Sequence, residues 1–291
     1  MAEIAFLRAE SQPEFPMKLL ASQLLAALLV VSVAQAAPNE KPLRILLITG
    51  GCCHDYATQK DLLKAGLEKR LKATVDQVHT DDKSTKPPLA IFGNPDYAKA
   101  YDLVIHDECA AAVSDEATIQ GVLAPHKQGI PGVNLHCAMH CYRIGPAGEP
   151  ADAGSPRAGW FEYLGLQSSG HGPQEPIAIA YVDKNHPIAK DLPEWTTIKE
   201  ELYNNVKIFD SARPIAQGKQ MVKKKAPKPG EAAEEEKQAV VAWTNLYQGK
   251  TRVFSTTIGH NNDTVGDDRY LDLVSRGVLW ATRQLETPSA K

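Results

Sequence analysis

Residues 44–51, which read RILLITGG, decide the fold of this chain. A continuous apolar run that stops at two glycines is typical of a strand buried on both faces that enters a turn towards a helix. Leucines with helical spacing follow at residues 59–71, and residues 74–78 are expected to form a second strand. The order of strand, helix and strand predicts a parallel α/β sheet.

The same alternation continues along the chain. A polar, proline-rich loop is expected at 83–95, a strand at 101–106, and a helix that Ser114 caps and that runs to about Lys127. A further strand at 129–135 then ends at a histidine. This rhythm predicts a doubly wound, mostly parallel sheet with helices on both faces, as in flavodoxin-like folds.

Ligands of such sheets bind beyond the carboxyl ends of the strands. Residues 51–55, 106–109 and 136–140 each follow or end a predicted strand. We therefore expect these three segments to surround one crevice.

The second half of the chain is richer in predicted strands, at 177–182, 240–246 and 252–258. Between them lies the charged tract KKKAPKPGEAAEEEK, which predicts a solvated loop insertion at 222–238. A terminal helix is expected at 267–285, because four apolar side chains share one helical face. These are Leu271, Val274, Val278 and Ala281.

The start of the chain has the pattern of an export signal. Met17 and Lys18 precede an apolar run at 19–33, and Ala34-Gln35-Ala36 follows as a small-x-small cleavage site. Residues 1–36 are thus expected to be an extension plus a signal peptide, and 37–291 a single domain, periplasmic or extracellular. The run is short for a membrane span, so none is expected after cleavage; an uncleaved anchor is the alternative.

Charge and cysteine content narrow the class of protein. The chain has 32 Lys and Arg against 35 Asp and Glu, without a basic stripe, so a nucleic-acid partner is not expected. Burial of the cysteines as small apolar side chains and disulfide formation both stay open. The five cysteines are Cys52, Cys53, Cys109, Cys137 and Cys141.

His136 and His140 form an H-x-x-x-H pattern. If a helix begins at His136, the two imidazoles lie one turn apart and could bind a divalent metal such as zinc. The glutamate of an H-E-x-x-H site is missing, so a zincin is excluded. Neither G-K-[ST] nor G-x-G-x-x-G is present, which excludes the common nucleotide-binding loops.

Several stretches together resemble the trehalose-utilisation ThuA-like family over residues 43–285. They are RILLITGG with His54-Asp55, YDLVIHDE, GVNLHCAMH, Gly159-Trp160-Phe161, His186-Pro187-Ile188, EELY at 200–203 and RVFSTTIGHNN. The resemblance implies a fold similar to class I glutamine amidotransferases. It also implies a role in sugar metabolism, on disaccharides or their 3-keto derivatives, and a homodimer.

The comparison with amidotransferases is chemically informative. Their nucleophilic cysteine lies in G-x-C-x-G directly after a strand, but here His136 takes that position and Cys137 comes one residue late. Their histidine is followed two residues later by glutamate, but here Asn262 follows His260. A cysteine needs a base, and the base needs an orienting partner. Glutamine amidotransferase activity is therefore not expected.

The resemblance implies a histidine/glutamate crevice. The catalytic candidates are His54, His136, His260 and Glu201, and the substrate-binding candidates are Asp55, Asp107, Trp160, Tyr203 and Asn261. Such a site could bind a metal that polarises a carbonyl, or act without metal as acid and base, in hydrolysis or isomerisation of a keto sugar. The alternative is a non-catalytic module that binds a carbohydrate or a partner.

Overall fold

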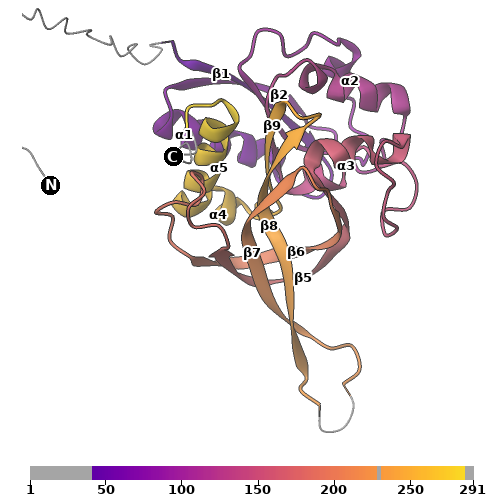
Figure 1. The fold of residues 1–291 in the computed structure, drawn as a ribbon, viewed down its shortest axis with the longest axis vertical. Helices are drawn as coiled ribbons and strands as arrows, with labels where there is room; N and C mark the ends of the chain where they lie inside the picture. Colours follow the sequence, from indigo (N-terminus) through magenta and orange to yellow (C-terminus); the bar gives the residue numbers. More distant parts are fainter. Residues whose placement is uncertain (1–40, 228–230, 286–291) are drawn as a thin grey trace, which may run out of the picture. The chain divides into compact units, whose positions relative to one another are not determined.

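The computed structural model describes residues 41–227 and 231–285, which form a nine-stranded sheet with helices (Figure 1). The strands are β1 (Leu43–Gly51), β2 (Ala73–Thr80), β3 (Leu103–Cys109), β4 (Gly132–Leu135), β5 (Leu166–Tyr181), β6 (Trp195–Ile208), β7 (Ala212–Lys223), β8 (Glu234–Tyr247) and β9 (Thr251–Thr256). The α-helices are α1 (Tyr56–Arg70), α2 (Glu116–Lys127), α3 (Gly159–Leu164), α4 (Asn262–Val265) and α5 (Asp268–Ala281). Three short 3-10 helices are η1 (Ala90–Gly93), η2 (His136–His140) and η3 (Pro156–Ala158).

The sheet has a parallel and an antiparallel half. Its strand order is β2-β1-β3-β4-β9-β8-β7-β5-β6. The pairs from β2 to β9 are parallel. The pairs from β9 to β6 are antiparallel. A mixed α/β sheet with a β-rich second half, as the sequence predicts, is confirmed.

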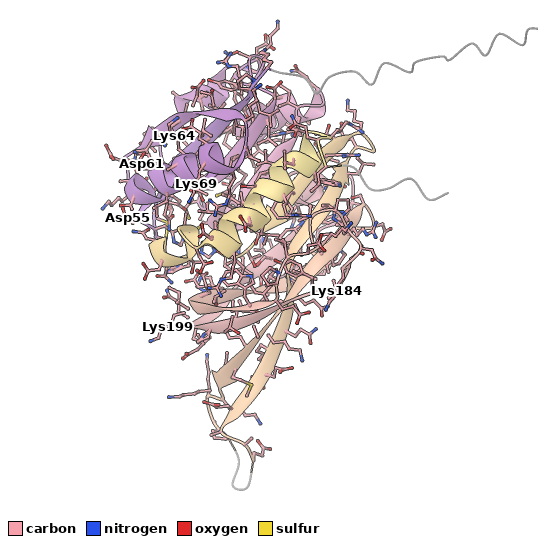
Figure 2. The ribbon with its side chains drawn as sticks, turned by 90° about the vertical axis from the view of Figure 1, so that its left-hand side faces the viewer. Asp55, Asp61, Lys64, Lys69, Lys184 and Lys199 are labelled. Carbon is pink, nitrogen blue, oxygen red and sulfur yellow. A yellow bond between two sulfur atoms is a disulfide. The ribbon has the colours of Figure 1, made fainter. Side chains whose placement is uncertain are left out.

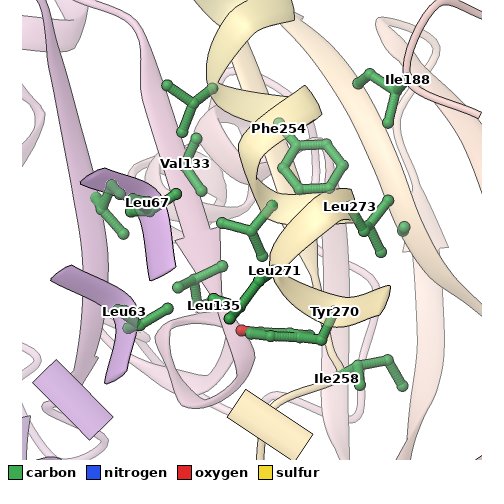
Figure 3. Packing of buried hydrophobic residues seen from close by; sticks show 14 of the residues in the cluster. Leu63, Leu67, Val133, Leu135, Ile188, Phe254, Ile258, Tyr270, Leu271 and Leu273 are labelled. Carbon is green, nitrogen blue, oxygen red and sulfur yellow. The ribbon is translucent and has the colours of Figure 1, made fainter. Parts of the chain in front are cut away.

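Helices cover both faces of the parallel half (Figure 1). Side chains of a strand point alternately to opposite faces, so Ile45 and Leu47 join the cluster beneath α1 and α5. Leu46 and Ile48 join the other cluster, with side chains of α2 and α3. Figure 3 shows the first cluster, where Leu63 and Leu67 of α1 and Leu271 of α5 lie over Leu135 of β4.

Two predicted helix boundaries need correction. Asp115, not Ser114, is the N-cap of α2, because its Oδ2 accepts hydrogen bonds from the Thr118 backbone N–H and hydroxyl, both at 2.8 Å. The last helix is shorter than predicted, but its four apolar side chains are buried as expected.

The predicted loop at 222–238 is too long at both ends, because residues 222–223 and 234–238 belong to strands. Lys223 ends β7 and Glu234–Lys237 begins β8, so the charged tract forms the outer part of a hairpin. Lys219 pairs with Glu236 across it at 2.9 Å. A two-stranded ribbon with charged side chains on both strands has no apolar alternation, so the pattern did not predict strands here.

The predicted signal peptide at 1–36 lies outside the described residues. Within 41–227 and 231–285, no helix is long and apolar enough to cross a membrane.

Candidate active site

Three histidines meet at the carboxyl ends of three parallel strands. His54 follows β1, His136 follows β4 and His260 follows β9. The ring centroids of His54 lie 4.7 Å from those of both His136 and His260, and the latter two are 5.4 Å apart. One nitrogen of each ring lies within 4.8 Å of the other two. Tetrahedral zinc requires nitrogens about 3.3 Å apart, from a Zn–N bond of about 2.05 Å, so a small closure would let all three bind one ion.

His136 occupies the sharp turn directly after β4. Its backbone φ is 41°, in the left-handed region that non-glycine residues adopt only rarely. Its Nδ1 lies 2.6 Å from the Thr257 carbonyl oxygen. A carbonyl only accepts, so Nδ1 carries the hydrogen and, in the neutral ring, Nε2 is left with a free lone pair. The fold thus presents Nε2 of His136 to the site.

Glu201 of β6 joins the histidines from the antiparallel half. Its Oε2 lies 3.5 Å from Nε2 of His136 and 3.4 Å from Nε2 of His171, and its Oε1 lies 3.4 Å from Nδ1 of His260. Gln174 donates to Oε1 at 3.3 Å and lies 2.8 Å from Nε2 of His260. The carboxylate therefore connects the histidines of the parallel half to strands β5 and β6.

Burial and charge separate the pKa values within this cluster. Burial alone would raise the pKa of Glu201, but its hydrogen bonds with His136 and His260 hold it well below its usual value. Burial alone would lower the pKa of His136, but Glu201 and Glu200 raise it. Burial, followed by the two neighbouring imidazoles, lowers the pKa of His54 to about 3. At neutral pH His54 is thus neutral and Glu201 ionised.

Glu200 positions the loop that carries His260. It is fully buried, and its carboxylate accepts hydrogen bonds from the backbone N–H groups of Gly259 (3.4 Å), His260 (3.0 Å) and Asn261 (3.4 Å). The side-chain amide of Gln59 in α1 also donates to the His260 carbonyl, at 3.0 Å. Neither Glu200 nor Gln174 was predicted from the sequence as a site residue. For Glu200, the one available signal was an acidic residue inside a strand.

A cavity of about 770 Å³ opens beside the cluster. His54 and His260 line it, whereas the nearly buried His136 and Glu201 lie behind this wall. Asp55 and Asn261, predicted to bind substrate, also line it. Both side chains have protein partners.

The Asp55 carboxylate caps α1, with a 3.4 Å contact to the Thr58 N–H, and accepts from Asn262 at 2.7 Å. Figure 2 shows Asp55 at the edge of the molecule, beside the first turns of α1. The Asn261 amide donates to the Lys199 carbonyl at 2.5 Å.

The family model ThuA, described as trehalose utilisation, matches residues 44–281. The chain belongs to the ThuA family.

One solved ThuA-like structure agrees with the fold of this ThuA-family chain, and two further structures have lower TM-scores. A ThuA-like protein from Parabacteroides merdae is similar with a TM-score of 0.60 and 21% identity, over 86% of this chain and 93% of that chain. A GMP synthase protein from Thermoplasma acidophilum gives 0.45 and 12%, over 84% and 98%. A glutamine amidotransferase from Thermotoga maritima gives 0.44 and 11%, over 82% and 98%. No curated protein matches the chain significantly.

The proposed metal pair His136 and His140 is not supported. Residues 136–140 of this ThuA-family chain form a 3-10 helix, in which residues four apart do not share a face. His140 instead stacks on Tyr203, with centroids 4.1 Å apart, and its Nε2 lies 2.9 Å from the Ser168 hydroxyl. The histidines whose nitrogens lie near that of His136 are His54 and His260, and these three could hold a metal ion.

Three other predicted site residues are buried. Trp160 donates to the Ala138 carbonyl at 2.9 Å within the core, so it cannot stack on a sugar. Tyr203 is also buried; its hydroxyl lies 3.3 Å from Nε2 of His136, and it supports that ring. Asp107 lies in the interior, and burial, followed by Glu108, raises its pKa well above the usual range.

His106 does not reach the crevice, contrary to the prediction for 106–109. Its Nδ1 lies 2.9 Å from the Glu108 carboxylate and its Nε2 lies 3.0 Å from Nε2 of His126, all fully buried on the other face of the sheet. Alternation along β3 turns His106 away from the face that Asp107 occupies.

The cysteines gather next to the histidines. Cys52 and Cys53 form a disulfide with each other, and Cys52 Sγ lies 3.4 Å from Cys109 Sγ. Cys137 joins Cys52 and Cys109 in one buried cluster. Cys141 accepts from the Ala110 N–H at 2.9 Å. Bridging and burial, the two alternatives from the sequence, thus both occur: Cys52 and Cys53 are bridged, and Cys109, Cys137 and Cys141 are buried free thiols.

Proposed function

We propose that the chain is an exported, sugar-active enzyme, a hydrolase or isomerase that acts on a disaccharide or its keto derivative. One observation carries this proposal: the imidazoles of His54, His136 and His260 converge beside a cavity, with an ionised Glu201 behind them. The family description, trehalose utilisation, supports a sugar as the substrate. Glutamine hydrolysis is not proposed, because His136 stands where an amidotransferase has its nucleophilic cysteine.

The three histidines are proposed to hold a divalent ion such as zinc, which would polarise a carbonyl or lower the pKa of a bound water. The residues of the chain have separate tasks. His54 and His260 face the cavity, through which the sugar would enter. Glu201 would orient His260 through its Nδ1 and accept a proton, and the Thr257 carbonyl would orient His136 through its Nδ1. Acceptors on the non-ligating nitrogen of an imidazole fix the orientation of the ring.

The same cluster supports a metal-free mechanism on the same substrates. The pKa of His136 is raised by Glu201 and Glu200 and that of His54 is lowered to about 3, so two neighbouring imidazoles differ in their affinity for a proton. Two titratable groups with separated pKa values can serve as general acid and general base.

One experiment separates these alternatives. The metal content of the purified chain and its turnover of a 3-keto-disaccharide are measured for the wild type, His54→Ala and His79→Ala. His79 lines the same cavity but is not part of the three-histidine group, which makes it the matched control. We expect one ion per chain in the wild type and the control, and loss of both the ion and turnover in His54→Ala.

Turnover without metal in the wild type, lost in His54→Ala, would contradict the metal and favour the acid–base mechanism. Sugar binding without turnover would contradict the proposed enzymatic activity and favour the alternative, a carbohydrate-binding module.

Export and dimerisation are separate parts of the proposal. N-terminal sequencing of the secreted protein should find a start near Ala37, whereas an intact residue 1–36 segment would contradict cleavage. A homodimer, implied by the family resemblance, is checked by the molar mass in solution.

A further inference from the structure

The cysteines beside the histidine cluster lie close enough for chemistry of their own. Cys52, Cys53 and Cys109 each have a sulfur within 4.8 Å of the other two. Three thiolates around a shared ion with bonds of about 2.3 Å would lie about 3.8 Å from one another. Cys52 and Cys109 are already at 3.4 Å.

Two strands hold this arrangement. Cys52 directly follows β1, and Cys109 is the last residue of the neighbouring parallel strand β3. Gly51 makes the close approach possible: its φ is 101°, and a Cβ there would lie 2.3 Å from the Cys109 carbonyl oxygen. A side chain at this position would push the two sulfurs apart.

The three sulfurs differ in burial. Cys109 is buried and Cys52 nearly so, whereas Cys53 is exposed and lines the same cavity as His54. An ion bound by the three sulfurs would thus have an open coordination position toward the solvent. In the structure, however, Cys52 and Cys53 are joined as a disulfide, which removes two of the three ligands.

We propose that reduction of the Cys52–Cys53 disulfide opens a site for a soft, thiolate-preferring metal ion, which Cys52, Cys53 and Cys109 hold. A dithiol reductant supplies the two electrons and two protons: its own sulfurs become a disulfide while the Cys52–Cys53 bond breaks to two thiols. Metal binding then releases the thiol protons. Thiolate ligands favour ions such as Cu(I) and Zn²⁺ over magnesium or calcium.

The test uses Cd²⁺ as the probe, because cadmium–thiolate bonds absorb in the ultraviolet and cadmium–imidazole bonds do not. The full chain is treated with a dithiol, freed of it without air, and titrated with Cd²⁺, beside an untreated sample. We expect a thiolate band that saturates at one ion per chain in the reduced sample and no band in the untreated one. A reduced sample without a band would contradict the proposed metal site. An equal band in both samples would show that metal binding does not require reduction of the Cys52–Cys53 disulfide.

Variants locate the ligands. Cys53→Ser, at an exposed position that should not disturb folding, is expected to weaken Cd²⁺ binding by about tenfold or more. Cys141→Ser is the control, since this buried thiol is not one of the three ligands, and it should keep the band. An unchanged affinity in Cys53→Ser would overturn the ligand assignment.

The histidine site is tested separately. His260→Ala should lose the ion of the proposed active site but keep the cadmium–thiolate band, so a failure of either proposal can be told from a failure of the other.

Discussion

The two halves of the sheet contribute to the candidate site in different ways. The parallel half supplies His54, His136 and His260, which lie in the turns that follow β1, β4 and β9. The antiparallel half supplies carboxylates: Glu201 contacts the imidazoles, and Glu200 holds the backbone that carries His260. The parallel half thus supplies the imidazoles. The antiparallel half supplies the carboxylates that position His260 and raise the pKa of His136. If this division is correct, substitutions in the two halves should have effects of different size and kind.

The largest expected effect comes from His136 in the parallel half. His136→Ala removes a proposed ligand together with the contacts to Glu201 and Tyr203. We expect turnover of a 3-keto-disaccharide to fall about 10³-fold, equivalent to about 4 kcal/mol in the barrier, with loss of bound metal. Steady-state kinetics and elemental analysis measure both.

His171→Ala is the matched control from the antiparallel half. Its imidazole contacts the same carboxylate at 3.4 Å but is 40% exposed, and we expect a loss of about tenfold, the lower end of the range for residues that support metal ligands. Equal losses of turnover in the two variants would contradict the proposed difference in role between the two halves of the sheet.

Glu200→Gln tests the supporting role of the antiparallel half. The variant replaces a buried carboxylate that accepts from three consecutive backbone N–H groups. Hydrogen bonds to a charged acceptor contribute about 1.5–3 kcal/mol, so we expect the free energy of unfolding in urea to fall by about 2 kcal/mol. Glu234→Gln, at an exposed position on the hairpin, should change it by less than about 0.5 kcal/mol. Similar changes in both variants would show that Glu200 does not hold the loop.

The halves also differ in how well the sequence predicts them. The parallel strands contain continuous apolar runs, and RILLITGG alone places His54 at a strand end. His136 and His260 could be predicted for the same reason, since strand ends of a parallel sheet meet at one edge.

The antiparallel half carries no such signal. β6 reads WTTIKEELYNNVKI, in which charges interrupt the apolar pattern, and β5 has irregular register at Ser168 and His171. Gln174 contacts His260, 86 residues away, and such pairing depends on the register of strands rather than on local sequence. For this reason Glu201 could be proposed only from the family resemblance, and Glu200 and Gln174 were missed.

His140 follows the parallel half and contacts Tyr203 and Ser168 of the antiparallel half. The pH dependence of the free energy of unfolding tests whether its imidazole is buried in the neutral form. Burial, followed by Arg143 and the neighbouring imidazoles, lowers its pKa to about 2. Below about pH 6.5 the unfolded chain binds a proton here that the folded chain does not, so the free energy of unfolding falls as the pH is lowered. His54, with its pKa lowered to about 3, acts in the same direction. The pKa of His136 is raised, so His136 opposes them.

For His140 alone, the free energy of unfolding at pH 5 is expected to be about 2 kcal/mol lower than at neutral pH. His140→Gln keeps a polar side chain but does not titrate, so its free energy of unfolding should fall by less than that of the wild type between pH 7 and pH 5. Urea unfolding at both values measures this, and parallel slopes would contradict a buried neutral imidazole at the junction.

The smallest effect is expected on the outer part of the β7–β8 hairpin, where Lys219 and Glu236 pair at 2.9 Å with both side chains about half exposed. Ion pairs in water gain little, because solvent screens the charges and ordering the side chains costs entropy. A double-mutant cycle with Lys219→Ala and Glu236→Ala should therefore give a coupling below about 0.5 kcal/mol, with metal content unchanged. The antiparallel half would then stabilise the site through its buried carboxylates alone. A coupling above about 1 kcal/mol, or a loss of metal, would mean that the hairpin ion pair also stabilises the positions of Glu200 and Glu201. The hairpin would then have to be counted among the parts of the antiparallel half that support the site.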